Sequence, residues 1–273
     1  MEHDNEELFE TAVREFKRIA EANEVPELLV GAYAREILLR EQSDSTGLRR
    51  TRDVDFGIKV DSWAMYEHFR KALFESEHFT PFGTGHPHKV LFEGQMEVDL
   101  VPFGGVAGKE QRLSCWPMDF QQEMNVTGYE EALAQARLVA FLGSNVRVVT
   151  LEAFVVLKFF SWNDRPDIRQ KDAVDIAYLL SHSGTLPSVL EELYSLENQD
   201  LVDAITDFDR LYHRWLGHKI SLCFSPRSKE ALCEILDREI SSEDWKLARQ
   251  MKAFYRDPNE ANQALSDLRK GMA

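Results

Sequence analysis

Two short acidic stretches decide the fold: Thr51-Arg-Asp-Val-Asp-Phe56 and Met96-Glu-Val-Asp-Leu-Val101. In each stretch carboxylates alternate with apolar residues, which is the pattern of a half-buried β-strand. Successive side chains of a strand point to opposite faces, so the acidic residues of each stretch share one face. If the two strands lie side by side, three or four carboxylates converge and repel one another unless cations are present. Mg²⁺ takes oxygen ligands and keeps positions for water and phosphate. The pattern therefore indicates a metal-dependent enzyme that acts on phosphates.

A glycine at a strand–helix junction precedes the first acidic stretch. The sequence predicts a short buried strand over Glu27–Val30, a turn at Gly31 and a helix over residues 32–40. Glycine allows close backbone approach, and the first turn of a helix offers unpaired N–H groups that suit a phosphate. Joined to Asp53, Asp55 and Asp99, this junction predicts a triphosphate cradle beside a metal site.

The remaining pattern changes near residue 150. Before it we expect a helix over residues 6–22, a hairpin over 89–103, a helix near 129–139 and a strand near 146–149. After it only helical periodicity is present. The expected helices span residues 151–163, 169–182, 187–196, 200–216, 227–238 and 241–255, with a last helix ending near residue 270. The sequence thus predicts an α+β protein: residues 1–150 with a mixed β-sheet flanked by helices, and residues 151–273 as an all-α domain that completes an active-site cleft.

Charge limits the partners of the chain. Its 273 residues carry a formal net charge of -15, which argues against a broad nucleic-acid footprint, since that needs a basic face. A local basic pocket that grips one RNA end or a nucleotide stays open. Two basic clusters are candidates, or are simply solvated or paired: Arg49, Arg50 and Arg52, and Lys158, Arg165, Arg169 and Lys171.

The sequence predicts a cytoplasmic protein. Its first residues are acidic and polar, unlike a signal peptide. The most apolar stretch, residues 151–160, is short and contains Glu152 and Lys158, so we expect no membrane span. The three cysteines are scattered and lack metal-binding spacing, which fits a reducing compartment.

Four stretches in a fixed order carry a family resemblance. They are Leu28-Leu-Val-Gly31-Ala-Tyr-Ala-Arg35, Thr51-Arg-Asp53-Val-Asp55-Phe56, Val98-Asp99-Leu-Val-Pro-Phe103, and the run from Val156-Leu-Lys158 through Asn163-Asp-Arg165 to Lys171-Asp172-Ala-Val-Asp175-Ile176. This order resembles the nucleotidyltransferase superfamily related to DNA polymerase β. More closely, it is similar to the bacterial AbiEii/AbiGii-type nucleotidyltransferases, the toxin arm of some abortive-infection and toxin–antitoxin pairs. The resemblance covers about residues 25–182, and the helical tail beyond it looks generic.

The resemblance implies a nucleotidyltransferase fold that transfers a nucleoside monophosphate from an NTP to a hydroxyl. Asp53 and Asp55 would hold two Mg²⁺ ions, with Mn²⁺ as an alternative, as in two-metal displacement at phosphorus. Asp99 would help deprotonate the attacking hydroxyl, as general base or co-ligand. Glu97 is an alternative ligand in its place. The alternative for Asp53 and Asp55 is a place on a solvent-facing edge strand, with no metal.

The resemblance also implies a nucleotide-binding set: Gly31, Ala32, Arg35, Arg52, Lys158, Arg165 and Asp172. Lys158 lies in an apolar helix, where it either reaches solvent or points towards phosphate. Asp172 would orient Lys158 or Arg165, while Asp175 serves equally well as a tie between helices. The chain departs from the family at Ala32, where Gly or Ser is usual, so a serine hydroxyl is missing.

The acceptor is not fixed by the sequence. The resemblance implies an RNA 3′ end such as that of tRNA, and an antitoxin protein as partner. A small molecule, as in antibiotic-modifying relatives, and a protein hydroxyl are the alternatives. A non-catalytic partner-binding protein with the same fold is a further alternative, although the intact set of three carboxylates speaks against it.

Overall fold

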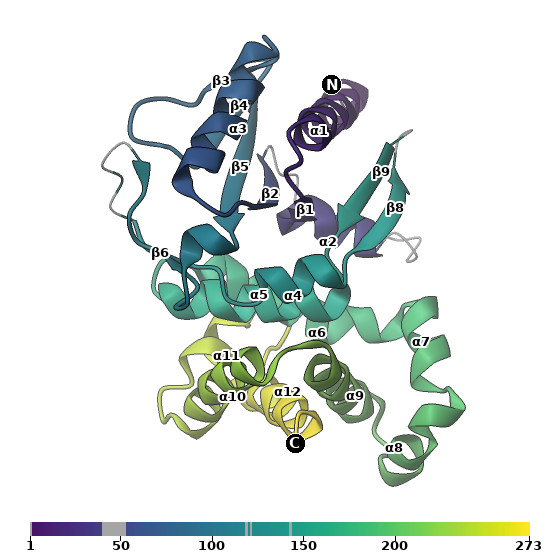
Figure 1. The fold of residues 1–273 in the computed structure, drawn as a ribbon. Coiled ribbons are helices and arrows are strands. Elements are labelled where there is room, and N and C mark those ends of the chain that lie inside the picture. The colour runs from purple at the N-terminus through teal and green to yellow at the C-terminus, as the bar shows by residue number, and fades with distance from the viewer. Residues whose placement is uncertain (1, 40–52, 118–119, 121, 142–143) are drawn as a thin grey trace. The chain divides into compact units, whose positions relative to one another are not determined.

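The computed structural model describes residues 2–39, 53–117, 120, 122–141 and 144–273. The chain forms two compact units, coloured from purple to teal and from teal to yellow in Figure 1. Among the described residues, the first unit contains residues 2–38 and those between 53 and 150. The second contains Leu39 and residues 151–273.

The first unit is built on a mixed sheet. Its seven strands lie in the order β3-β4-β5-β2-β1-β9-β8. They are β1 (Glu27–Val30), β2 (Asp53–Lys59), β3 (Phe79–Pro81), β4 (Lys89–Phe92), β5 (Met96–Phe103), β8 (Arg137–Phe141) and β9 (Ser144–Val148). The pairs β2–β5 and β1–β9 are parallel and the others antiparallel. A separate small ribbon pairs β6 (Arg112–Leu113) with β7 (Met124–Asn125).

One face of the sheet is covered by α1 (Glu2–Ala22) and α3 (Trp63–Glu75), which contact each other (Figure 1). Phe16 of α1 stacks on Phe56 of β2 at a ring-centroid distance of 4.0 Å and meets Phe69 of α3 edge-on at 5.6 Å. All three side chains are buried. The apolar half of the β2 alternation therefore faces the core, and the acidic half is left for the opposite face.

Ser62 caps α3: its side chain accepts a hydrogen bond from Met65 N–H. The opposite face of the sheet carries α4 (Tyr129–Ala134), whose Tyr129 ring lies 5.4 Å from Phe103. The expected helix near 129–139 is wrong in its second half, because residues from Arg137 onward form β8 and pair with β9. A short apolar run fits a strand or a helix equally well until its pairing is known.

Among the described residues of the second unit, all regular elements are helices, which confirms the predicted α+β class with an all-α C-terminal part. The helices are α5 (Leu151–Asp164), α6 (Gln170–His182), α7 (Pro187–Leu193), α8 (Gln199–Ala204), α9 (Phe208–Cys223), α10 (Pro226–Ser241), α11 (Lys246–Gln250) and α12 (Pro258–Gly271). The expected helix over 200–216 is two helices. Its break falls where Ile205 is extended and Asp207 caps α9 by accepting from Arg210 N–H.

Two glycines let α9 and α12 approach at backbone distance (Figure 1). A Cβ at Gly217 would lie 2.0 Å from the carbonyl oxygen of Leu268, and one at Gly271 would lie 2.0 Å from that of Arg214. The same helix pair shares the fully buried Asp267, which accepts hydrogen bonds from Arg210 at 3.1 Å and from Arg214 at 2.9 Å. Close backbone packing and the charged hydrogen bonds of the buried Asp267 therefore hold α9 and α12 together.

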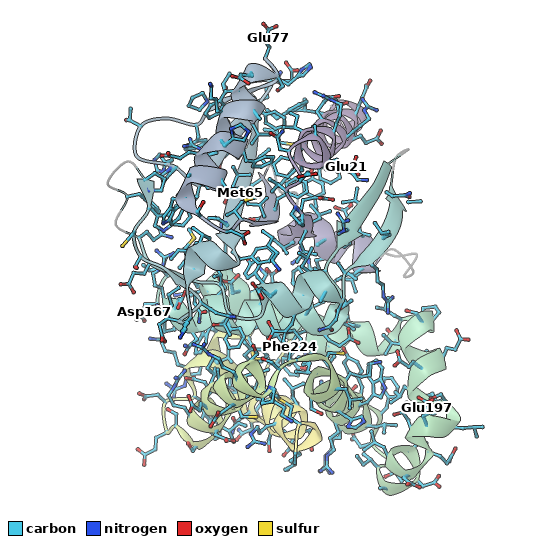
Figure 2. All side chains as sticks on the ribbon, in the orientation of Figure 1. Glu21, Met65, Glu77, Asp167, Glu197 and Phe224 are labelled. Atoms are coloured by element: carbon cyan, nitrogen blue, oxygen red, sulfur yellow. The ribbon has the colours of Figure 1, made fainter. Side chains whose placement is uncertain are left out.

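Exposed acidic side chains account for part of the negative charge. Glu77, in the turn after α3, points away from the first unit, and Asp167 and Glu197 point away from the second (Figure 2). None of the helices in the described residues has both the length and the apolar composition needed to cross a bilayer.

We predict that Gly217→Ala destabilises the second unit. In an exposed helix this change stabilises by about 1 kcal/mol, but here the added methyl group meets the Leu268 carbonyl. We expect the free energy of unfolding to fall by about 2 kcal/mol, as for overpacked interiors. Urea denaturation followed by circular dichroism measures it. His218→Ala, at the next and exposed position of α9, is the control, and a stabilised Gly217→Ala variant would contradict the close approach.

Candidate functional site

The structure brings the two acidic stretches together. In the parallel pair β2–β5, Asp53 stands opposite Glu97 and Asp55 opposite Asp99. Residues at matching positions of neighbouring strands project to the same face, about 4.8 Å apart. All four residues are of intermediate exposure. We call this set the carboxylate cluster. It lies on the face of the sheet opposite to α1.

Gly31 packs directly against the carboxylate cluster. It follows Val30, which pairs with Asp55 in the β1–β2 register, and it opens α2 (Gly31–Leu39). A Cβ at Gly31 would lie 1.9 Å from Asp55 Oδ2, and the backbone there has φ of +71°. The close contact excludes any side chain at this position, and the positive φ favours glycine. The predicted strand–glycine–helix junction is thus present beside the acidic face, with Ala32 as the second residue of the helix.

Lys89 is a member of this face that the sequence reasoning missed. It lies on β4 opposite Asp99, and its Nζ is 2.9 Å from Glu97 Oε2 and 3.2 Å from Asp99 Oδ1. The sequence feature that could have identified Lys89 is the register of the hairpin over residues 89–103. Two residues paired directly across an antiparallel pair share a face, so a correct register would have placed Lys89 beside Asp99.

The cluster shifts the pKa of two of its members. Burial raises the pKa of Asp99; the Lys89 charge lowers it, but the nearby Asp53 and Glu97 charges raise it, and the net direction is upward. Burial by itself lowers the pKa of Lys89, but Glu97 and Asp99 outweigh that effect and raise it. Lys89 is therefore charged at neutral pH and is the counter-charge of the cluster.

The donor chemistry of this face fits Mg²⁺. Asp53, Asp55 and Asp99 offer carboxylate oxygens, the ligands that Mg²⁺ prefers. Asp99 Oδ1 is buried and accepts no hydrogen bond within the described residues, although Lys89 lies close. With its side chains as they stand, the described part of the chain has no group of three or more His, Cys, Asp or Glu residues arranged to hold a metal ion. The carboxylates match the ion in chemical type, while Lys89 engages one of them.

A second cluster lies within the helical unit. Lys158 on α5 places Nζ 2.8 Å from Asp172 Oδ1 and 2.8 Å from Asp175 Oδ2, both on α6. Ser161 donates a hydrogen bond to the other oxygen of Asp172 at 2.8 Å. The side chain of Lys158 is 18% exposed. Asp172 therefore contacts Lys158, one of the two residues that it was expected to orient, and Asp175 shares that contact.

Lys158 and Asp172 stabilise each other's charged forms, and Asp175 adds to the stabilisation of the Lys158 ammonium. Burial alone lowers the pKa of Lys158, but Asp175 and Asp172 outweigh it and raise that pKa. Burial alone raises the pKa of Asp172, but the charge and hydrogen bond of Lys158 and the bond from Ser161 bring it below its ordinary value. Lys158 is thus paired, and its charge is balanced within its own unit.

The remaining expected residues are scattered. Arg35 is buried on α2 in the first unit. Arg165 follows the end of α5 in the second, and its backbone N–H donates to Trp162 O. Arg52, with Arg49 and Arg50, lies outside the described residues.

Comparison with solved structures gives a weak similarity. The solution structure of the antibiotic-resistance factor ANT(2'')-Ia matches with 13% sequence identity over 60% of this chain and 76% of that one, at a TM-score of 0.36. No curated protein matches the sequence.

Comparison with protein families gives a match over most of the chain. The family described as nucleotidyl transferase AbiEii toxin, type IV toxin–antitoxin system, matches residues 47–267. The match contains Asp53, Asp55, Asp99, Lys158 and Asp172, and it begins after Gly31. It also runs through the helical tail, which the sequence reasoning had treated as generic. The predicted family is confirmed: the chain belongs to the AbiEii nucleotidyl transferase toxins of type IV toxin–antitoxin systems.

Proposed function

We propose that this nucleotidyltransferase is metal-dependent and transfers a nucleoside monophosphate from an NTP to the 3′ end of an RNA such as tRNA. The observation that carries the metal requirement is the β2–β5 register, which sets Asp53 and Asp55 beside Asp99 and Glu97 on one face. A triphosphate brought to this face meets like charges, and a divalent cation removes that repulsion.

Asp53 and Asp55 are the proposed magnesium ligands. When bound, Mg²⁺ supplies Lewis-acid stabilisation of the phosphate oxygens in the displacement. Asp99 is the proposed acceptor of the proton from the attacking hydroxyl, or a further ligand. Its Oδ1 is buried and lies 3.2 Å from the Lys89 ammonium, so it can accept a proton once that contact is given up. A hydroxyl of the RNA acceptor would then attack the α-phosphorus of the NTP, and pyrophosphate would leave.

Gly31 and Ala32 are the proposed phosphate contacts. They open α2, where backbone N–H groups have no partner within the helix and the dipole favours a negative charge. Because Ala32 has no hydroxyl, these backbone groups must supply the hydrogen bonds that a serine would share. Arg35 and Arg52 stay proposals for additional nucleotide contacts.

Lys158 and Arg165 are the proposed nucleotide contacts from the helical unit, by the family resemblance. Asp172 and Asp175 hold the Lys158 ammonium from two sides. Such a pair keeps a lysine charged and restricts its rotamers, which prepares it for an anionic ligand.

The RNA acceptor rests on the family resemblance. The formal charge of -15 means that RNA contact would be local, because a broad basic face is lacking in the sequence. The type IV toxin–antitoxin family supports an antitoxin protein as partner. A small molecule and a protein hydroxyl are the alternative acceptors.

The test is transfer of α-labelled ATP, CTP, GTP and UTP to total RNA with Mg²⁺. We expect label on RNA with one preferred base, and loss of it in Asp53→Asn/Asp55→Asn. Label that persists in the variant would contradict the assignment of the ligands. Label on protein or on a small molecule, with RNA unlabelled, would replace the RNA acceptor by one of its alternatives. Transfer that is unchanged in EDTA would contradict the metal requirement.

We predict that Gly31→Ala lowers transfer at least about a hundredfold, the scale of a 1 Å misplacement in an active site. The new Cβ would overlap Asp55 Oδ2, so Asp55 must move. Gly85→Ala is the matched control: Gly85 also has a positive φ, +79°, but a Cβ there meets no atom within 4 Å. It carries the same type of backbone strain without the contact. Equal losses in both variants would contradict the role of the Gly31–Asp55 contact.

We predict that Lys158→Met destabilises the protein at pH 7 by about 3 kcal/mol, because two carboxylates are left without their counter-charge. The Asp172 pKa is lowered in the folded state, so its contribution is present above about pH 4 and is lost as the pH falls. The loss of unfolding free energy caused by Lys158→Met should therefore become smaller below about pH 4.

Denaturant unfolding at pH 7 and at acidic pH measures both effects. Lys171→Met, which removes an exposed lysine of α6, is the control. A loss of stability in Lys158→Met that is equal at the two pH values would contradict its electrostatic origin in the Lys158–Asp172 pairing.

A further inference from the structure

Lys89 occupies an unusual position for a cation. It lies on β4 opposite Asp99, bridges Glu97 and Asp99, and places its ammonium 5.2 Å from the centre of the Phe82 ring. Its side chain is only 22% exposed. The ammonium is therefore enclosed between two carboxylates and an aromatic face, an arrangement that stabilises a bound cation.

We propose that Lys89 is a built-in counter-cation of the carboxylate cluster, which competes with the divalent metal for Asp99 and so sets the metal affinity of the site. This inference rests on the proposed function, since it concerns the same carboxylates. It adds a residue from β4 that lies outside the set of expected ligands. Lys89 is a positioning residue, because it acts through Asp99 and Glu97.

The geometry explains why the two cations compete. A metal ion held by Asp99 Oδ1 would approach an oxygen that lies 3.2 Å from the Lys89 ammonium. Two positive charges a few ångströms apart repel strongly on a half-buried face, where the effective dielectric is below that of water. Metal loading therefore requires the Lys89–Asp99 contact to be given up, while Glu97 can keep the lysine at 2.9 Å.

This arrangement also assigns a role to Glu97. Its carboxylate is the less buried of the two lysine partners, with the side chain 39% exposed against 22% for Asp99. If Lys89 moves towards Glu97 when the metal binds, the ammonium keeps a partner and Asp99 is released. Glu97 is then the group that holds the Lys89 ammonium when the metal is bound, which differs from its role as an alternative metal ligand in place of Asp99.

The test is direct metal binding to the full-length, metal-free protein. Mn²⁺ is the probe, because its free fraction is counted by electron paramagnetic resonance without any turnover. We expect Lys89→Met to lower the Mn²⁺ dissociation constant about tenfold or more, the effect of removing one nearby like charge. Lys89→Arg should stay near the wild type because it keeps the charge.

Two controls separate charge competition from other effects. Lys71→Met removes an exposed lysine of the same unit, 3.5 Å from Glu75 on α3, and should leave Mn²⁺ affinity unchanged. In an Asp99→Asn background, Lys89→Met should increase Mn²⁺ affinity by less, because residue 99 then carries no charge for the metal and Lys89 to compete for. If Lys89→Met does not fold, Lys89→Gln removes the charge and keeps a polar side chain.

The outcomes are distinct. Tighter Mn²⁺ binding in Lys89→Met, absent from Lys89→Arg and Lys71→Met, supports the proposal. Unchanged or weaker binding in folded Lys89→Met or Lys89→Gln, with Mn²⁺ bound by the wild type, overturns the proposal and leaves the metal site standing. Absence of Mn²⁺ binding in every variant overturns both the counter-cation and the proposed metal ligands.

Discussion

Parallel pairing of β2 with β5, in register, forces Asp53, Asp55, Glu97 and Asp99 onto one face of the sheet. The opposite face of the same strands is fixed by apolar packing, with Phe16 of α1 stacked on Phe56. Shifting either strand by one residue would bury the carboxylates under α1 and expose the apolar side chains. The hydrophobic core therefore holds the acidic face in place, although those charges repel one another. Free energy from the buried face stabilises an arrangement that the exposed face alone would not adopt.

Alternation and glycine placement made this part of the molecule predictable from the sequence. The strand at Glu27–Val30, the helix after Gly31 and the two acidic strands follow from local rules, and they appear as expected. The packing of Gly31 against Asp55 was predictable only as a close approach, since its partner depends on the β1–β2 register. The family was predictable for a related reason: its motifs lie in short local stretches, and the match over residues 47–267 contains most of them.

Long-range pairing explains what the sequence did not reveal. Residues from Arg137 onward have a pattern that suits a helix, but β9 is available beside them and a hairpin forms. Lys89 was recognised as part of a strand, and its meeting with Asp99 depends on the hairpin register. Gly217 and Gly271 gave no signal at all, because their role exists only where α9 meets α12. In each case the decisive contact joins residues that are distant in sequence or on separate elements.

Each of the two units contains a lysine that is paired with two carboxylates, and this pairing changes how the positive charge of that lysine is interpreted. Lys89 is held by two carboxylates of β5, and Lys158 by two of α6. Read from the sequence, Lys158 is a positive charge available to a phosphate, yet in the structure each lysine is already paired with two carboxylates. On the β2–β5 face the register gathers four carboxylates, so a triphosphate approaching them meets like charges. Positive charge for the nucleotide on this face must then come from elsewhere, either from ions or from cationic side chains outside the carboxylate cluster. This gathering of like charges is the physical reason to propose a divalent metal here, and it follows from the register of the strands rather than from the family name.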